Sequence, residues 1–244
     1  HDALPILTTY GEALQNALTP VLKTLHQIPT QLQQMALERE KTIRLNVLAA
    51  STLVTQALIS YKKDHDGLHF RLIQNSQCED ADITVFTREN FQIPTDTKER
   101  YELFKERIFL AVPHNSPYAS EESVRLQDFA HEDFISLSGS RSIRTICDRY
   151  CMQAGFVPHI IYESDSPDTV KNLIASGLGV GFWPHYTWGM DSMEQIRLLP
   201  IAEPTCQRAI ILQLHRHARG QEAVCSFYAF LSRYLRQLKA AEQH

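Results

Sequence analysis

Hydroxyl-bearing residues collect at three predicted strand-to-helix turns, and these residues are the best suited to bind a small molecule. The first turn holds Ser51 and Thr52, directly after a strand predicted over residues 43–49. Unpaired backbone N–H groups and the helix dipole favour negative charge at a helix N-terminus, so this turn could hold a carboxylate or another anion. Ser51 could equally serve as a plain N-cap, and capping does not exclude ligand contact.

A second polar turn adds a guanidinium to its hydroxyl groups. Ser138, Ser140 and Arg141 belong to the run S-L-S-G-S-R, which overlaps the end of a strand predicted over residues 133–137. An arginine can hold a carboxylate with two parallel hydrogen bonds, which makes this turn a second candidate for anion binding. The alternative is a solvated polar loop without a ligand.

The third candidate turn holds Ser164 and is less suited to an anion. Asp165 and Asp168 place negative charge near the start of a predicted helix, where they would compete with an anionic ligand. They could instead meet an amine or a neighbouring arginine. Phe182, in the strand that follows, could line a wall of the same cleft, although an aromatic residue in a strand belongs more often to the core.

The segment from residue 163 to 184 predicts the architecture around these turns. Ser166 can cap a short helix, and Pro167 suits its first position. Gly177 fits the left-handed position that ends a helix, and Gly179 permits a close approach of two backbones before a buried strand over residues 180–183. Such a unit belongs to a sheet covered by helices, where ligands bind beyond the strand ends.

Motifs for catalysis, cofactors and metals are missing from the sequence. It contains no G-x-S-x-G elbow, H-E-x-x-H pair, phosphate loop or dinucleotide fingerprint, so we expect no catalytic residues and no cofactor. Cys147 and Cys151 lie four residues apart without a second ligand pair, and the simpler interpretation is a pair of plain thiols. His215 and His217 share one strand face without a third ligand, so we expect no metal site.

Composition places the chain among ordinary globular proteins. It has 244 residues, of which 43% are hydrophobic and 21% charged, and a net charge of −4 that argues against a nucleic-acid surface. The sequence has no run of about 18 apolar residues, so we expect no membrane span. The start of the sequence does not resemble a signal peptide, and five cysteines are an odd number, so we expect reduced thiols and a cytoplasmic location.

The N-terminal region carries a heptad pattern of apolar residues. The spacing is 4, 3, 4, 3, 4 and 3 over Leu14, Leu18, Val21, Leu25, Ile28, Leu32 and Met35. Such a seam predicts a helix that packs along another helix, and we favour a dimerising linker over a helix that lies on its own domain. Pro20 and Pro29 predict that this helix is kinked or divided in two.

Strands and helices alternate through the rest of the chain. Beyond those already mentioned, we predict strands near residues 68–73, 81–86, 108–112, 160–162 and 209–214, and helices near 52–63, 142–153 and 221–238. Ser51 is expected to cap the first of these helices. Only residues 74–80 separate the strands at 68–73 and 81–86, which is too short for a crossover helix between parallel strands.

These features together resemble the LysR-type bacterial transcriptional regulators over nearly the whole chain. The resemblance rests on residues 7–14 (L-T-T-Y-G-E-A-L), 43–51, 82–85 (D-I-T-V), 109–118, 154–156 (A-G-F) and, most diagnostic, 173–184. It implies an α/β fold of two Rossmann-like lobes joined by two crossover strands, as in type 2 periplasmic binding proteins, preceded by a linker helix. The implied division is 1–41 for the end of the winged-helix domain and the linker, 43–107 plus 218–240 for lobe I, and 108–217 for lobe II.

The resemblance implies the effector-sensing and oligomerisation region of a transcriptional regulator. A small-molecule effector, with a carboxylate as one candidate, is expected in the cleft between the lobes, and the chain is expected to form homodimers or tetramers. DNA contact is expected only through the winged-helix domain, most of which this sequence lacks. About ten residues of a usual helix before residue 81 are also missing. The alternatives are a transporter's solute-binding protein, which shares the fold, and a small α/β enzyme.

Overall fold

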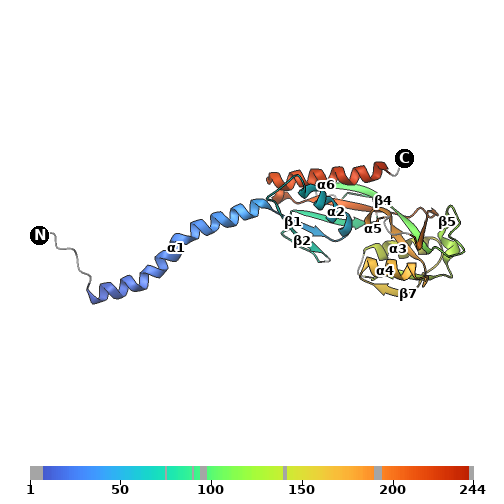
Figure 1. The fold of residues 1–244 in the computed structure, drawn as a ribbon, viewed down its shortest axis with the longest axis horizontal. Coiled ribbons are helices and arrows are strands. Elements are labelled where there is room, and N and C mark those ends of the chain that lie inside the picture. The colour runs from blue at the N-terminus through green and yellow to red at the C-terminus, as the bar shows by residue number, and fades with distance from the viewer. Residues whose placement is uncertain are drawn as a thin grey trace.

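The computed structural model shows a long N-terminal helix followed by an α/β body (Figure 1). It describes residues 8–74, 76–89, 91–93, 98–139, 142–189 and 194–241. The helices are α1 (Thr9–Lys41), α2 (Ser51–Lys62), α3 (Ser142–Gln153), α4 (Pro167–Ala175), α5 (His185–Trp188) and α6 (Glu222–Ala241), with 3₁₀ turns η1 (Leu126–Phe129) and η2 (Arg216–Ala218). The strands are β1 (Thr42–Val47), β2 (His69–Gln74), β3 (Ile83–Arg88), β4 (Arg100–Pro113), β5 (Val124–Arg125), β6 (Asp133–Leu137), β7 (His159–Ser164), β8 (Gly181–Pro184), β9 (Ile196–Leu199), β10 (Ile201–Glu203) and β11 (Gln207–Leu214).

One sheet runs through the body in the order β2-β1-β3-β11-β4-β8, and β9 also pairs with β4. Its first part carries a core with α2 and α6, built from residues such as Leu45, Val85, Leu212 and Phe227. The second part joins a separate core with α3 and α4 around Phe134 and Trp183. The two cores confirm the predicted two-lobed α/β architecture.

Strand β4 passes from one lobe to the other. Its first half, to Arg107, pairs antiparallel with β11, and its second half, from Ile108, pairs with β8 and β9. The predicted division placed residues 108–217 in lobe II. However, β11 hydrogen-bonds along its length to β3 and β4 in the sheet of lobe I, because it returns antiparallel between them, so we assign it to that sheet.

The α4–β8 unit forms as its residue types predict. The hydroxyl of Ser166 accepts a hydrogen bond from the backbone N–H of Thr169, and Pro167 opens the helix. Gly177 takes a left-handed φ of +80° after the helix. A Cβ atom on Gly179 would lie 2.6 Å from the carbonyl oxygen of Asp133, so glycine is required where the two backbones meet.

The start of α2 corrects one prediction. Ser51 was expected to be the N-cap, but the cap position is Ala50, with a left-handed φ of 61°, and no side-chain hydrogen bond caps this helix. Ser51 is instead the first helical residue. The chain turns one residue earlier than predicted because the tight link after β1 forces Ala50 into a conformation that few non-glycine residues adopt.

The connection between β2 and β3 contains no helix among its described residues, as its length predicts. Both strands are parallel to β1 and lie on opposite sides of it. β2 ends level with Val47, whereas β3 begins level with Leu45. The chain therefore steps back by only two residues along the sheet, which explains how so short a link can replace a full crossover.

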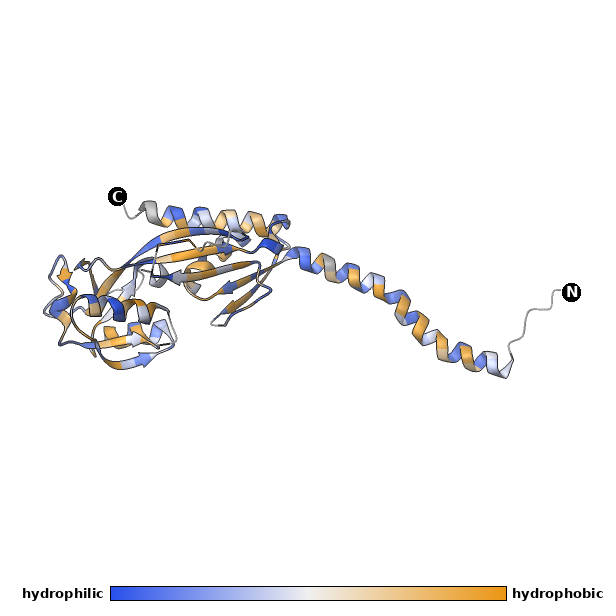
Figure 2. Ribbon diagram, turned by 180° about the vertical axis from the view of Figure 1, so that it is seen from behind, coloured by the Kyte–Doolittle hydropathy of each residue, from blue (hydrophilic) through white to orange (hydrophobic). Residues whose placement is uncertain are grey.

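Helix α1 continues unbroken through Pro20 and Pro29, and it bends along its length (Figure 1). It projects away from the body, and its apolar residues are exposed to solvent (Figure 2). None of the described helices is long and apolar enough to cross a membrane.

Candidate functional site

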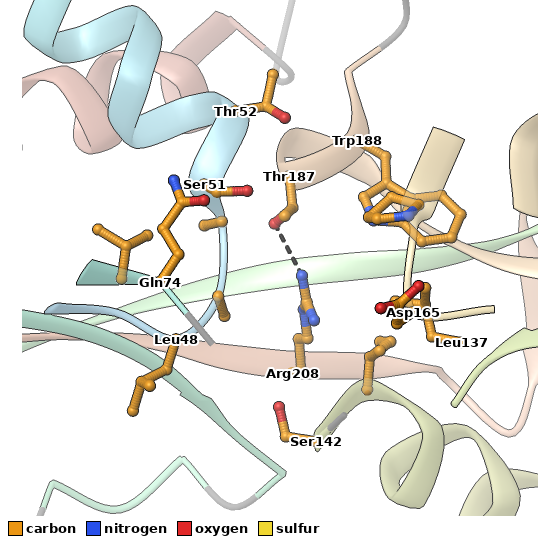
Figure 3. Close-up of a pocket in the computed structure, with 15 residues that line it drawn as sticks. Leu48, Ser51, Thr52, Gln74, Leu137, Ser142, Asp165, Thr187, Trp188 and Arg208 are labelled. Carbon is orange, nitrogen blue, oxygen red and sulfur yellow. Dashed lines mark hydrogen bonds between the residues drawn. The ribbon is translucent and has the colours of Figure 1, made fainter. Parts of the chain in front are cut away.

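A cavity of about 240 Å³ lies between the two lobes at the starts of three helices. Its lining comes from the β1–α2 turn, the end of β2, the starts of α3 and α4, helix α5 and strand β11. In Figure 3, Leu48 and Gln74 lie on one side and Leu137 and Asp165 on the other, with Arg208 between them. This arrangement presents polar groups from both lobes to one small volume.

The N-terminus of α2 presents unpaired backbone donors to the cavity. Ser51 and Thr52 line the cavity in its first turn, and no acidic residue lies in that turn. The first N–H groups of a helix have no partner within the helix, and here no side chain caps them. Backbone donors and a hydroxyl therefore converge where an anion is favoured.

A buried arginine forms the floor of the cavity. The Nε atom of Arg208 donates to Oε2 of Glu106 at 2.6 Å, and its Nη2 atom donates to Oγ1 of Thr187 at 2.8 Å. The other oxygen of Glu106 accepts from the backbone N–H and the hydroxyl of Thr187, at 2.6 and 2.7 Å. A guanidinium has five N–H donors, so these two bonds leave donor capacity for a ligand.

The same ion pair lies at the crossing point between the lobes. Arg208 of β11 is directly opposite Glu106 of β4, one residue before the pairing of β4 with β11 ends at Arg107. Glu106 is completely buried and Arg208 is 3% exposed. Removal of either partner would therefore leave an uncompensated buried charge at the crossover.

Further contacts tie the lobes together around the cavity. The hydroxyl of Thr87 in β3 lies 2.7 Å from that of Ser142 in α3. The hydroxyl of Tyr150 in α3 donates to the carbonyl of Gln207 in β11 at 2.7 Å. These direct polar contacts belong to the present arrangement of the lobes, and a change in the angle between lobes would alter them.

The structure brings only part of the predicted site together. Ser51 and Thr52 line the cavity, whereas Ser138, Ser164 and Phe182 are not among its lining residues. Ser140 and Arg141 lie outside the described residues.

The remaining predicted residues have structural contacts nearby. The backbone N–H of Ser138 donates to the carbonyl of Ser164 at 2.9 Å, and the hydroxyl of Ser164 accepts from the N–H of Ser166. Phe182 is buried and stacks on Phe134 in the core of lobe II, with ring centroids 5.8 Å apart. Ligand contact by these three residues stays a prediction.

Sequence reasoning missed Arg208, Thr187 and Gln74 as lining residues. The one available signal was a charged residue at the edge of the apolar strand 209–214, since arginine is rarely buried unless it is paired. Its partner Glu106 lies 102 positions away in the sequence, so no local pattern could join them.

The cysteines do not contribute to the cavity. All five are free thiols, and Cys147, Cys151 and Cys206 are buried. Burial raises the pKa of Cys151 to about 12 and holds the thiol pKa of Cys147 well above its usual value. Within the part of the chain that the structure describes, no cluster of three His, Cys, Asp or Glu residues could hold a metal ion.

Residues 37–236 match the family described as the LysR substrate binding domain. The chain belongs to this family. As a LysR-family domain, it is the effector-sensing region of a transcriptional regulator.

Relatives of this LysR-family domain are transcriptional regulators. The transcriptional dual regulator GltC of Bacillus subtilis is 22% identical over 245 residues, with 96% of this chain and 80% of GltC covered. The HTH-type transcriptional regulator YybE of the same organism is 25% identical over 212 residues, with coverage of 84% and 72%.

Solved LysR structures share the fold. The effector binding domain of QuiR in complex with shikimate has a TM-score of 0.64 at 18% identity, covering 80% of this chain and 97% of QuiR's. The Synechocystis CcmR regulatory domain in complex with 2-PG has a TM-score of 0.67 at 15% identity, covering 78% and 95%.

Proposed function

We propose that the cavity between the lobes binds a small carboxylate effector. The observation that carries this proposal is the convergence of two kinds of donor, the uncapped N-terminus of α2 at Ser51 and the buried guanidinium of Arg208. Both favour a carboxylate, which can accept several charge-assisted hydrogen bonds at once. In QuiR, a domain of the same fold, the bound ligand is shikimate.

Two further lining residues suit hydroxyl groups. Gln74 lies on the same side of Arg208 as Leu48, and Asp165 lies on the other side, and both carry hydrogen-bonding oxygens (Figure 3). A negative charge at Asp165 disfavours a second carboxylate there. We therefore expect a ligand with one carboxylate and hydroxyl or amine groups at its other end, of a size that suits about 240 Å³.

Effector binding would act through the strands that cross between the lobes. A ligand can shift the balance between two arrangements only by its difference in affinity for them. Contact with Arg208 reaches β4 through Glu106 and α5 through Thr187, so a ligand here would favour one arrangement of the crossover strands. In the full regulator, α1 would carry this change to the DNA-binding domain.

Helix α1 is the proposed dimerisation element. Its heptad residues are exposed by 39% to 65%. We propose that a second copy of the chain covers this seam, since a regular heptad seam is most simply buried by another helix. We also propose that the regulator acts without enzymatic turnover and in the cytoplasm, where its DNA would lie.

Thermal-shift and calorimetric titrations with shikimate, quinate and 4-hydroxybenzoate, each with one carboxylate and at least one hydroxyl group, test the effector proposal. We expect at least one of these carboxylates to raise the melting temperature of the chain. In Ser51→Ala, the affinity for that ligand should fall about tenfold, because one hydrogen bond to a charged group is lost.

The matched control is Ser120→Ala, which removes an exposed hydroxyl far from the cavity lining. It should bind the ligand like the parent. If Ser51→Ala and Ser120→Ala bind equally well, the ligand does not sit at α2. If none of the carboxylates binds, the proposed ligand class is wrong.

A further inference from the structure

A second groove, of about 420 Å³, lies on the face of the lobe I sheet opposite α2 and α6. Alternation along β1 separates the two faces: Leu45 and Val47 pack against the helices, whereas Asn46 points the other way and lines the groove. The remaining lining comes from β3, from the end of β11 and from the β2–β3 link. Among these residues only Leu48 also lines the effector cavity.

The groove is open because the link between β2 and β3 contains no helix among its described residues. Parallel strands are commonly joined by a helix that packs on the sheet face. Here Gln77, Cys78 and Glu79 of the short link line the groove beside the sheet, and no described helix of this link covers the sheet face.

The floor of the groove is a row of polar side chains across three adjacent strands. Asn46 of β1 lies directly opposite Thr84 of β3, and Thr84 lies directly opposite Gln213 of β11. The hydroxyl of Thr84 is already paired with Nε2 of His215 at 2.8 Å. Burial lowers the pKa of His215, so this ring is neutral at pH 7 and adds no charge to the floor.

Asn46 is the member of this row with an unpaired buried oxygen. It is 3% exposed, and its Oδ1 atom has no hydrogen-bond partner among the described residues. An unpaired polar atom at such depth destabilises the fold, and most buried polar atoms in proteins have partners. The Oδ1 atom has almost no accessible surface, so only a small group inserted at the bottom of the groove could pair with it.

The lining of the groove indicates a ligand in which an apolar part lies next to one polar group. Leu48 and the half-buried Phe86 line the same groove further along β1 and β3, and the guanidinium of Arg88 lies over the Phe86 ring, 5.6 Å from its centroid. Glu79 and Arg88 contribute opposite charges to the lining, so the groove favours a neutral molecule over an ion.

We propose that this groove is a second ligand site, which takes an uncharged aromatic carboxamide. Its amide would pair with the side chain of Asn46 through one donated and one accepted hydrogen bond, since both groups carry a donor beside an acceptor. Its ring would pack on Phe86 and Leu48. This site is separate from the effector cavity and does not depend on the effector proposal.

Protection of Cys78 from alkylation tests the proposal with benzamide as the probe. Cys78 is half-buried in the wall of the groove, and its thiol donates to Asp80, which raises the thiol pKa and makes alkylation slow. We expect benzamide to slow iodoacetamide labelling of Cys78 at least threefold, with no effect on Cys225 in α6. Benzoate, which has the same shape but a charge, should protect Cys78 much less.

Asn46→Leu removes the amide and keeps the branched shape of the side chain. This variant should be more stable than the parent, with a melting temperature higher by about 3 °C, because the unpaired atom is gone. Benzamide should no longer protect Cys78 in it. Ser51→Ala, in the other cavity, should keep the protection.

Three results would overturn the proposal. Benzamide could fail to protect Cys78 up to its solubility limit, or it could protect Asn46→Leu as well as the parent. Protection that rises with protein concentration in the absence of benzamide would mean instead that a second copy of the chain covers the groove.

Discussion

Helices α1 and α6 are both amphipathic, but the apolar face of α6 is buried and that of α1 is exposed. In α6, Val224, Phe227 and Leu231 are completely buried against the sheet of lobe I. In α1, Leu14 and Leu32 are exposed by 59% and 60%. Figure 2 shows α6 lying along the body and α1 extending away from it.

The difference shows what an apolar stripe does and does not determine. Both sequences contain apolar residues at helical spacing, and both form helices of more than five turns. Periodicity predicts the helix and its apolar face. Periodicity does not determine whether that face packs on the same chain or on another one. That depends on where the helix joins the body, and α1 joins it only at its C-terminal end, where β1 begins.

Truncation of the α6 face should have the largest effect. Leu231→Ala removes a completely buried side chain, and we expect the free energy of unfolding to fall by about 3 kcal/mol. Leu25→Ala, the matched change in α1, should alter unfolding by less than about 0.5 kcal/mol at concentrations where the chain is monomeric. Urea denaturation monitored by tryptophan fluorescence measures both. Equal losses would show that α1 packs on its own chain.

A charge in the α1 seam should have the next largest effect, on association. Leu25→Asp places a carboxylate at the centre of the heptad pattern, and we expect the dissociation constant of the dimer to rise at least tenfold. Analytical ultracentrifugation measures it. Asn16→Asp, at an exposed position off the seam, is the control and should associate like the parent. A parent chain that is still monomeric at about 50 μM would contradict the proposed role of α1.

The polar anchor of α6 should matter least. Arg236 donates to Glu102 of β4 at 2.7 Å, but its side chain is 67% exposed. Solvent screens such a pair, so Arg236→Ala should lower the free energy of unfolding by less than about 1 kcal/mol. The loss should shrink further in 1 M salt. A loss as large as that of Leu231→Ala would mean that α6 is held by charge and not by burial.

Much of the fold could be predicted because its signals are local. The cap at Ser166, the left-handed Gly177 and the close approach at Gly179 follow from the residue types at each position. The predicted cap at Ser51 failed by one residue, since the geometry of the link after β1 was decided by β1 and α2 packing together. Propensity does not contain that information.

The candidate site was predicted only where a helix start defines it. Ser51 and Thr52 line the cavity because strand-to-helix turns lie at the ends of strands, which sequence patterns can locate. Arg208 could not be found in this way. Its role depends on Glu106 and Thr187, which lie on two other elements and meet it only after the strands have crossed.

By itself, the sequence determined the alternation of strands and helices, the apolar face of each long helix and the short β2–β3 link, because these depend on neighbours within a few residues. The tertiary structure alone decided three further features. It buried the Glu106–Arg208 pair at the crossover, left the Oδ1 atom of Asn46 without a hydrogen-bond partner among the described residues, and exposed the seam of α1. All three depend on which distant segments meet, and that is a property of packing rather than of local pattern.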